Sequence, residues 1–230
     1  MSEPSPAERY QRATSRGKSP LLSAFVETIP FDLDPFQHSA CESVEQGRGV
    51  LVAAPTGAGK TAVAEFAIYL ALQDPDAKVF YTTPMKALSN QKYTELVEAH
   101  GASEVGLLTG DTSINPHARV VIMTTEVLRN MLYADSELLV HLRYVIMDEV
   151  HYLADRFRGA VWEEVIIHLP DDVQLISLSA TVSNAEEFGD WLQTVRGDTD
   201  IVVSETRPVP LYQHMLVGER LVPLFRSDQS

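Results

Sequence analysis

The sequence lacks the features that would set it apart from ordinary globular proteins. Its single cysteine, Cys41, allows no internal disulfide, and no cluster of Cys and His residues completes a zinc site around it. No run approaches the roughly 18 consecutive apolar residues of a membrane span, and the start of the chain has no apolar segment typical of a secretion signal. We therefore expect no membrane segment and a cytoplasmic location.

Positive charge is also scarce. The 230 residues include 18 Lys and Arg against 32 Asp and Glu, which gives a formal net charge of −14. This balance argues against a protein that binds nucleic acid through a broadly basic surface, so any such contact has to be local. Apolar residues make up 45% of the chain, which is enough for a sizeable core and excludes wholesale disorder.

The chain divides by texture into three parts. Residues 1–20 contain three prolines and four serines without a periodic apolar face, which predicts a disordered tail. Residues 21–206 alternate short β-branched runs with longer segments of helical period, a pattern typical of an α/β fold with a mostly parallel sheet and helices on both faces. Residues 207–230 contain three more prolines and one short apolar run, and we expect them to be an exit segment.

The expected strands are apolar at mostly consecutive positions, as strands buried on both faces are. They cover 49–53, 78–82, 105–108, 119–123, 143–147, 173–178 and 200–203. Apolar residues at helical spacing predict helices over 60–73 and 185–195. Ser183 and Glu186 form a capping box before the second of these helices, and Asp34 followed by Pro35 marks another helix start.

The strongest functional signal is the segment Ala-Pro-Thr-Gly-Ala-Gly-Lys-Thr at 54–61, between an expected strand and an expected helix. Gly57 and Gly59 allow the backbone to curl so that successive N–H groups point at phosphate oxygens, and the helix N-terminus adds its positive potential. Ala54 stands where the strict pattern has glycine. The curvature near the phosphates is still supplied by Gly57 and Gly59.

The residues that follow these glycines suit a nucleotide with a metal ion. Lys60 is placed to reach the β- and γ-phosphates of ATP, and the hydroxyl of Thr61 is placed to bind Mg²⁺. The predicted ATP-binding residues of this loop are Thr56, Gly57, Ala58, Gly59, Lys60 and Thr61.

Two adjacent carboxylates follow the expected strand 143–147 and supply the second half of such a site. Asp148 is predicted to hold Mg²⁺, and Glu149 to orient the water that attacks the γ-phosphate. His151 is a weaker candidate, because a single histidine after a strand is usually a packing residue. The predicted catalytic residues are Lys60, Asp148, Glu149 and His151.

These segments resemble the motifs of superfamily 2 DExH-box helicases. The segment 54–61, called the phosphate loop below, is similar to motif I. Asp-Glu-Val-His at 148–151 is similar to motif II, and Ser-Ala-Thr at 179–181 is similar to motif III. The run Thr-Pro-Met-Lys-Ala-Leu-Ser-Asn-Gln at 83–91 is similar to motif Ia of the superkiller-like branch, which includes exosome-associated RNA helicases. The resemblance implies a RecA-like first motor domain that binds Mg-ATP and single-stranded RNA or DNA.

The resemblance also implies roles that the residues alone do not indicate. Phe31 would stack on adenine, and the amide of Gln37 would bind the edge of that base. Ser179 and Thr181 would couple the nucleotide state to movement of the strand. The sugar-phosphate backbone would be held at Pro84, Lys86, Asn90, Gln91, Thr109, Gly110, Thr124 and Thr125.

The sequence has no QxxGRxGR-type motif. In the family, that motif lies on a second RecA-like domain and supplies an arginine that stabilises charge on the γ-phosphate. After Thr181 only 230 − 181 = 49 residues remain, too few for such a domain. We therefore expect the N-terminal portion of a longer ATP-dependent helicase, which needs a second motor domain as its partner and hydrolyses ATP poorly by itself.

Two alternatives remain at this point. The chain could be a module that binds nucleotide or nucleic acid without ATPase or unwinding activity of its own. It could also be another P-loop enzyme such as a phosphotransferase, although neither a basic lid nor an acceptor pocket is recognisable after the phosphate loop.

Overall fold

The computed structural model of the protein describes residues 19–154, 159–180, 185–207 and 214–224. The first helix among the described residues, α2 (Pro20–Val26), begins at the last residue of the segment predicted as a tail. The rest of that predicted tail, residues 1–18, and the predicted cap residue Ser183 lie outside the described residues.

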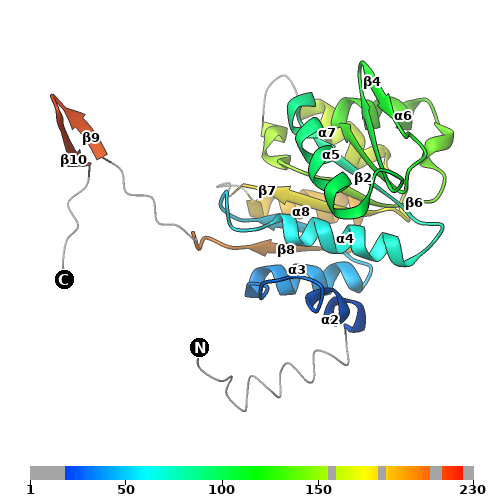
Figure 1. Cartoon of the computed structure of the whole chain (residues 1–230), viewed down its shortest axis with the longest axis horizontal. Coiled ribbons are helices and arrows are strands. Elements are labelled where there is room, and N and C mark those ends of the chain that lie inside the picture. The colour runs from blue at the N-terminus through cyan, green and yellow to red at the C-terminus, as the bar shows by residue number, and fades with distance from the viewer. Residues whose placement is uncertain (1–18, 155–158, 181–184, 208–213, 225–230) are drawn as a thin grey trace, which may run out of the picture.

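A mostly parallel sheet forms the centre of the structure (Figure 1). It has eight strands in the order β4-β3-β5-β2-β6-β7-β1-β8. All neighbouring strands are parallel except β4, which runs antiparallel to β3. The strands are β1 (Gly49–Ala53), β2 (Lys78–Thr83), β3 (Val105–Thr109), β4 (Thr112–Ile114), β5 (Val120–Thr124), β6 (Leu142–Met147), β7 (Gln174–Ser179) and β8 (Thr199–Val203). The mostly parallel α/β fold predicted from the sequence is thereby confirmed.

The sequence did not predict β4. This strand has three residues, none of them buried, so it lacks the apolar run that marked the other strands. It is joined to β3 by a two-residue turn at Gly110 and Asp111, because Thr109 pairs with Thr112. The turn matters for the site, since it projects beyond the end of β3.

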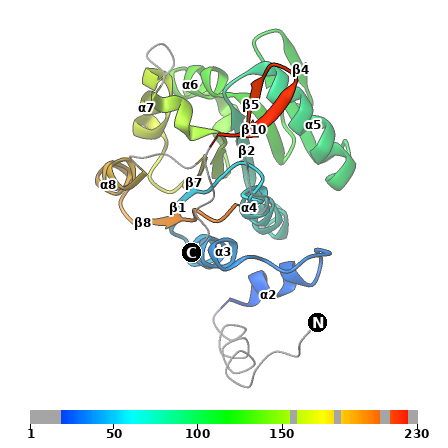
Figure 2. The ribbon, with the colours of Figure 1, turned by 90° about the vertical axis from the view of Figure 1, so that its left-hand side faces the viewer.

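Helices cover both faces of the sheet (Figures 1 and 2). One apolar core lies under α2, α3 (Pro35–Glu45), α4 (Thr61–Gln73) and α5 (Lys86–His100). The other lies under α6 (Thr125–Tyr133), α7 (Gly159–His168) and α8 (Ala185–Arg196). Two short 3₁₀ helices, η1 (Glu137–Leu139) and η2 (Val150–Ala154), flank β6.

The helix starts and the buried stripe of α4 follow the sequence pattern. Asp34 is the N-cap of α3, with proline in the first turn. All five residues of the predicted α4 stripe are buried: Val63, Phe66, Ala67, Leu70 and Ala71. This helix packs against β2 and β6 and so fixes its own N-terminus beside the end of the sheet.

Side chains alternate between the two cores along each central strand, as the pleat requires. On β2, Tyr81 belongs to the core under α4, whereas Phe80 belongs to the opposite core. On β6, Ile146 lies on the α4 side and Met147 on the other. The next residue, Asp148, therefore continues on the α4 side of the sheet.

The predicted exit segment contains a hairpin that the sequence analysis did not predict. Strands β9 (His214–Val217) and β10 (Arg220–Pro223) pair antiparallel across a turn in which Gly218 has φ +63°. The apolar run counted as one segment is thus two short strands interrupted by Gly218 and Glu219. In Figure 1 the hairpin stands apart from the eight-stranded sheet, and every described residue from His214 to Leu224 is exposed.

Candidate nucleotide and nucleic-acid sites

The phosphate loop joins the end of β1 to the start of α4. Gly57 and Gly59 have φ values of +84° and +80°, in the left-handed region that glycine adopts without strain. A Cβ atom on Gly59 would lie 2.6 Å from Nε2 of Gln37, so a side chain there meets an obstacle as well as an unfavourable φ. The curvature predicted for Gly57 and Gly59 is therefore present, and both positions have backbone angles that favour glycine.

Lys60 lies half-buried at the end of the loop. Its Nζ donates hydrogen bonds to the carbonyl oxygens of Ala54 (2.7 Å) and Pro55 (3.1 Å). Burial lowers the pKa of Lys60, and the nearby charges of Glu149 and Asp148 oppose that shift. The interaction with both carboxylates places the lysine and the acidic pair at the same edge of the sheet.

Asp148 accepts a hydrogen bond on each carboxylate oxygen. Oδ2 accepts one from the hydroxyl of Tyr81 at 2.7 Å, and Oδ1 accepts one from the backbone N–H of Glu149 at 2.9 Å. The backbone N–H of Asp148 donates to the carbonyl of Thr82 on the neighbouring strand. Tyr81 was not among the predicted site residues, and its signal in the sequence is only a tyrosine inside a buried strand.

Glu149 has φ +57°, a left-handed conformation that is unusual for a residue with a side chain. Its Oε2 lies 3.3 Å from Nδ1 of His151, and the backbone N–H of Ala180 points at the same Nδ1 atom from 3.4 Å. One ring nitrogen cannot donate to Glu149 and accept from Ala180 at once, so the tautomer of the ring decides which of the two contacts is a hydrogen bond. His151 thus connects the second acidic residue with the end of β7.

The residues at this edge fit a magnesium ion bound to a nucleotide. Thr61 is exposed in the first turn of α4, and Asp148 is half-buried. Each oxygen of Asp148 accepts one hydrogen bond and keeps a further acceptor position. Mg²⁺ typically takes one or two protein oxygen ligands together with phosphates and water, which this pair of residues can provide.

The predicted coupling residues are only partly within the described residues. Ser179 is buried at the end of β7, its carbonyl accepts a hydrogen bond from the N–H of Ala54, and its Oγ has no hydrogen-bond partner in the described part of the chain. Ser179 therefore adjoins the start of the phosphate loop. Thr181 lies outside the described residues.

Gln37 ties α3 to the phosphate loop. Its side chain is buried, and Nε2 donates to the carbonyls of Gly59 (2.8 Å) and Ala58 (3.3 Å). Oε1 accepts a hydrogen bond from the N–H of Asp34 at 2.8 Å, the N-cap residue of the same helix. Phe31, the other residue predicted to contact adenine, precedes this helix and has 48% of its surface exposed.

The residues predicted to hold a nucleic-acid strand lie at the same edge but differ in exposure. Lys86, Asn90, Gln91 and Gly110 are exposed, whereas Pro84, Thr109, Thr124 and Thr125 are buried. The hydroxyl of Thr125, for example, donates to the carbonyl of Thr83. The exposed members are thus accessible to a ligand, whereas the buried hydroxyl of Thr125 is used within the protein.

Lys86 is paired with a residue that the sequence analysis did not single out. Its Nζ lies 2.7 Å and 2.5 Å from the two carboxylate oxygens of Asp111, in the turn between β3 and β4. The hydroxyl of Thr109 donates to the same carboxylate at 3.1 Å. The hydrogen bond from Lys86 is the main cause of the lowered pKa of Asp111.

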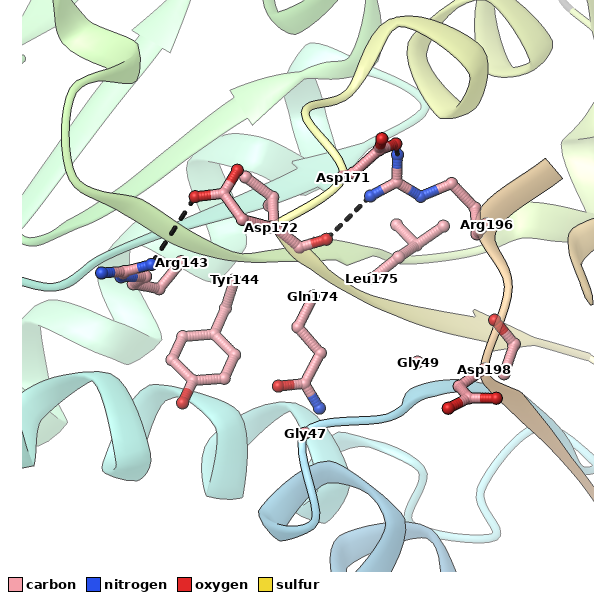
Figure 3. A pocket seen from close by; sticks show the side chains of 12 residues that line it. Gly47, Gly49, Arg143, Tyr144, Asp171, Asp172, Gln174, Leu175, Arg196 and Asp198 are labelled. Carbon is pink, nitrogen blue, oxygen red and sulfur yellow. Dashed lines mark hydrogen bonds and ion pairs between the residues drawn. The ribbon is translucent and has the colours of Figure 1, made fainter.

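A pocket of about 350 Å³ opens at the opposite edge of the sheet, at the amino ends of β6, β7 and β1 (Figure 3). Its rim carries two ion pairs, Arg143 with Asp172 at 3.6 Å and Arg196 with Asp171 at 3.9 Å. Because the phosphate loop follows the carboxyl end of β1, this pocket is separate from the candidate nucleotide site.

In the described ranges, no helix is both long enough and apolar enough to cross a bilayer.

Comparison with known proteins agrees with this arrangement of motifs. The probable helicase HelY of Mycobacterium leprae is 65% identical over 209 residues, which are 91% of this chain and 23% of that protein. The antiviral helicase SKI2 of Saccharomyces cerevisiae is 48% identical over 200 residues, 86% of this chain and 16% of that protein. The chain thus spans less than a quarter of the length of these relatives.

A solved structure gives the same picture. The helicase Lhr of Mycobacterium smegmatis, in a structure with ssDNA and AMP-PNP, matches 82% of this chain and 28% of its own, with a TM-score of 0.67 and 32% identity. The sequence profile of the DEAD/DEAH box helicases matches residues 34–188, more than half of the chain. These matches confirm the resemblance seen in the motifs: the chain belongs to the DEAD/DEAH box helicase family, with relatives in its superkiller-like branch.

Proposed function

We propose that this chain is the nucleotide-binding motor domain of an ATP-dependent helicase that acts on RNA or DNA. The proposal is carried by one observation: the half-buried ammonium of Lys60 interacts with the loop carbonyls and with the charges of both Asp148 and Glu149. A cation held between a phosphate loop and two carboxylates suits a magnesium–triphosphate group. The presence of AMP-PNP and ssDNA in the Lhr structure supports the same assignment.

In this proposal each residue acts through the atom it presents to the nucleotide. The N–H groups around Gly57 and Gly59 bind phosphate oxygens, and Lys60 exchanges the carbonyls of Ala54 and Pro55 for the β- and γ-phosphates. Thr61 and Asp148 would hold Mg²⁺, which would neutralise charge on the phosphates. The carboxylate of Glu149 accepts a hydrogen bond from the attacking water and so orients it.

Gln37 and Phe31 would contact adenine in this proposal. The amide of Gln37 already donates hydrogen bonds to the phosphate loop. A base that bound to this amide would therefore alter its contacts with the loop. The strand would lie along the exposed residues of α5 and the β3–β4 turn, with a second RecA-like domain closing the site. The single cysteine, Cys41, is free and cannot form a disulfide within the chain, which fits the reducing cytoplasm in which we place the protein.

Substitution of Lys60 tests the nucleotide site. We expect Mg-AMP-PNP to raise the melting temperature of the wild-type chain, because a ligand that binds only the folded state stabilises it by about 2.7 kcal/mol at 100 times its Kd. Lys60→Ala should keep the fold and lose most of this increase, because the loop loses its phosphate partner. Differential scanning fluorimetry measures both quantities.

Lys78→Ala serves as the control, since Lys78 begins β2 at the opposite edge of the sheet. This variant should keep the nucleotide-dependent increase. An unchanged increase in Lys60→Ala would contradict the proposed function.

A further inference from the structure

We propose that Tyr81 is a positioning residue of the nucleotide site, whose hydroxyl holds the carboxylate of Asp148 in the orientation that binds Mg²⁺. The inference rests on the proposed function and adds a residue to it. It concerns a side chain that belongs to none of the helicase motifs quoted above.

The sheet brings these two residues together. Tyr81 lies on β2 and pairs in register with Ile146 on β6, two residues before Asp148. Both side chains lie on the α4 side of the sheet, and the hydroxyl oxygen is 2.7 Å from Oδ2 of Asp148. Because parallel strands β2 and β6 are neighbours, the contact is set by the sheet rather than by a loop.

The direction of the hydrogen bond is fixed by chemistry. Tyr81 is 1% exposed, and its hydroxyl oxygen lies within hydrogen-bond distance of Oδ2 of Asp148. An ionised carboxylate only accepts hydrogen bonds, so the O–H of Tyr81 is the donor. Since Oδ1 accepts from the N–H of Glu149, both oxygens are held and the carboxylate cannot rotate freely.

The aromatic ring of Tyr81 makes a second contact. Nζ of Lys92 on α5 lies 5.6 Å from the centroid of the Tyr81 ring, within the range of a cation–π contact, and it also pairs with Glu95 at 2.6 Å. Lys92 is 16% exposed, so this cation is largely covered. Tyr81 thus contacts both α5, through Lys92, and the carboxylate of the proposed metal ligand Asp148.

A purely structural role would not need the hydroxyl. Phenylalanine fills nearly the same volume in a buried strand, whereas a buried hydroxyl requires a hydrogen-bond partner to offset its loss of water. Asp148 is the partner found here. Removal of a group that hydrogen-bonds a metal ligand typically weakens metal affinity by about 10–100-fold.

The test is Tyr81→Phe, read by binding of a fluorescent ATP analogue rather than by turnover. In EDTA, the affinity of the variant for the nucleotide should equal that of the wild type. With Mg²⁺ added stepwise, the concentration that gives half of the metal-dependent gain in affinity should rise about 10-fold. The melting temperature, measured in parallel, reports whether the variant is folded.

Tyr144→Phe is the matched control, because Tyr144 is a half-buried tyrosine on β6 at the opposite edge, beside the pocket in Figure 3. It should leave the Mg²⁺ titration unchanged. Asp148→Asn should abolish most of the metal-dependent gain, and adding Tyr81→Phe to it should cause no further loss, because the hydroxyl acts through that carboxylate.

The outcomes separate this inference from the proposed function. If the wild type binds no nucleotide, or shows no gain with Mg²⁺, the proposed function itself fails. If the wild type shows the gain and Tyr81→Phe titrates like it, the positioning role of Tyr81 is wrong. Equal loss of affinity in EDTA and in Mg²⁺ would also overturn it, because the hydroxyl would then support the phosphate loop and not the metal ligand.

Discussion

At the scale of single residues, the candidate strand site contains a lysine that is already engaged. Lys86 bonds both oxygens of Asp111, and the two side chains are 46% and 67% exposed. A phosphate group that binds Lys86 therefore has to replace a carboxylate. An exposed pair of this kind is weak, so Asp111 should lower the affinity for a strand without preventing binding.

Asp111→Asn should consequently tighten single-strand binding by about two- to fivefold at low salt, because Lys86 is freed and one negative charge is removed. Fluorescence anisotropy with a labelled single strand measures the change. In a Lys86→Ala background the gain should largely disappear.

Glu98→Gln is the control for charge alone, since Glu98 is exposed on the same helix but near its far end. It should change the affinity little. A gain of equal size in this variant, or a full gain from Asp111→Asn in the Lys86→Ala background, would show that the ion pair is not the cause.

At the scale of elements, the N-terminus of α3 and the phosphate loop behave as one unit because Gln37 bonds both. Its amide satisfies the carbonyls of Ala58 and Gly59 through one end and the N–H of Asp34 through the other. A carboxylate at this position could keep the contact with Asp34 but would face two carbonyl oxygens.

We therefore expect Gln37→Glu to lower the free energy of unfolding by about 1–3 kcal/mol, because a buried pair of hydrogen bonds becomes a repulsive contact. Urea denaturation without nucleotide measures this. Gln46→Glu, at the other end of α3, should have little effect, since Gln46 is exposed and its Oε1 only accepts a hydrogen bond from Arg48. An unchanged free energy of unfolding for Gln37→Glu would contradict a stabilising role for the hydrogen bonds between Gln37 and the phosphate loop.

At the scale of the whole molecule, the phosphate loop and the Asp148–Glu149 pair lie on the same eight-stranded sheet, and the chain spans 23% of the length of the Mycobacterium leprae relative. The family resemblance assigns the arginine that stabilises the γ-phosphate to a second motor domain. Binding and turnover should therefore be separable in this chain.

We expect the 230-residue chain to bind Mg-ATP but to hydrolyse it slowly, with little stimulation by single strands. A steady-state phosphate-release assay, with Lys60→Ala as the baseline, measures this. Strong strand-stimulated turnover would show that the second domain is dispensable. Binding without turnover above the baseline is the result that the alternative of a binding module also predicts.

The sequence determined the features that depend on neighbouring residues. Consecutive apolar runs such as 143–147 predicted buried strands because burial on both faces requires apolar side chains at every position. The phosphate loop and the pair Asp148–Glu149 could be predicted from sequence because each is a continuous segment whose residue types suit its proposed chemistry. The short polar strand β4 and the hairpin after His214 carried no such pattern.

Tertiary structure decided which of these segments meet. Nothing in the spacing of Tyr81 and Asp148, or of Lys86 and Asp111, shows that they are in contact; the first contact depends on β2 lying beside β6, and the second on the turn that follows β3. The amide of Gln37 likewise reached the phosphate loop through the packing of α3 beside α4. Local motifs can be recognised from consecutive residues, whereas contacts between distant residues follow from the strand order, which is set by packing of the whole sheet.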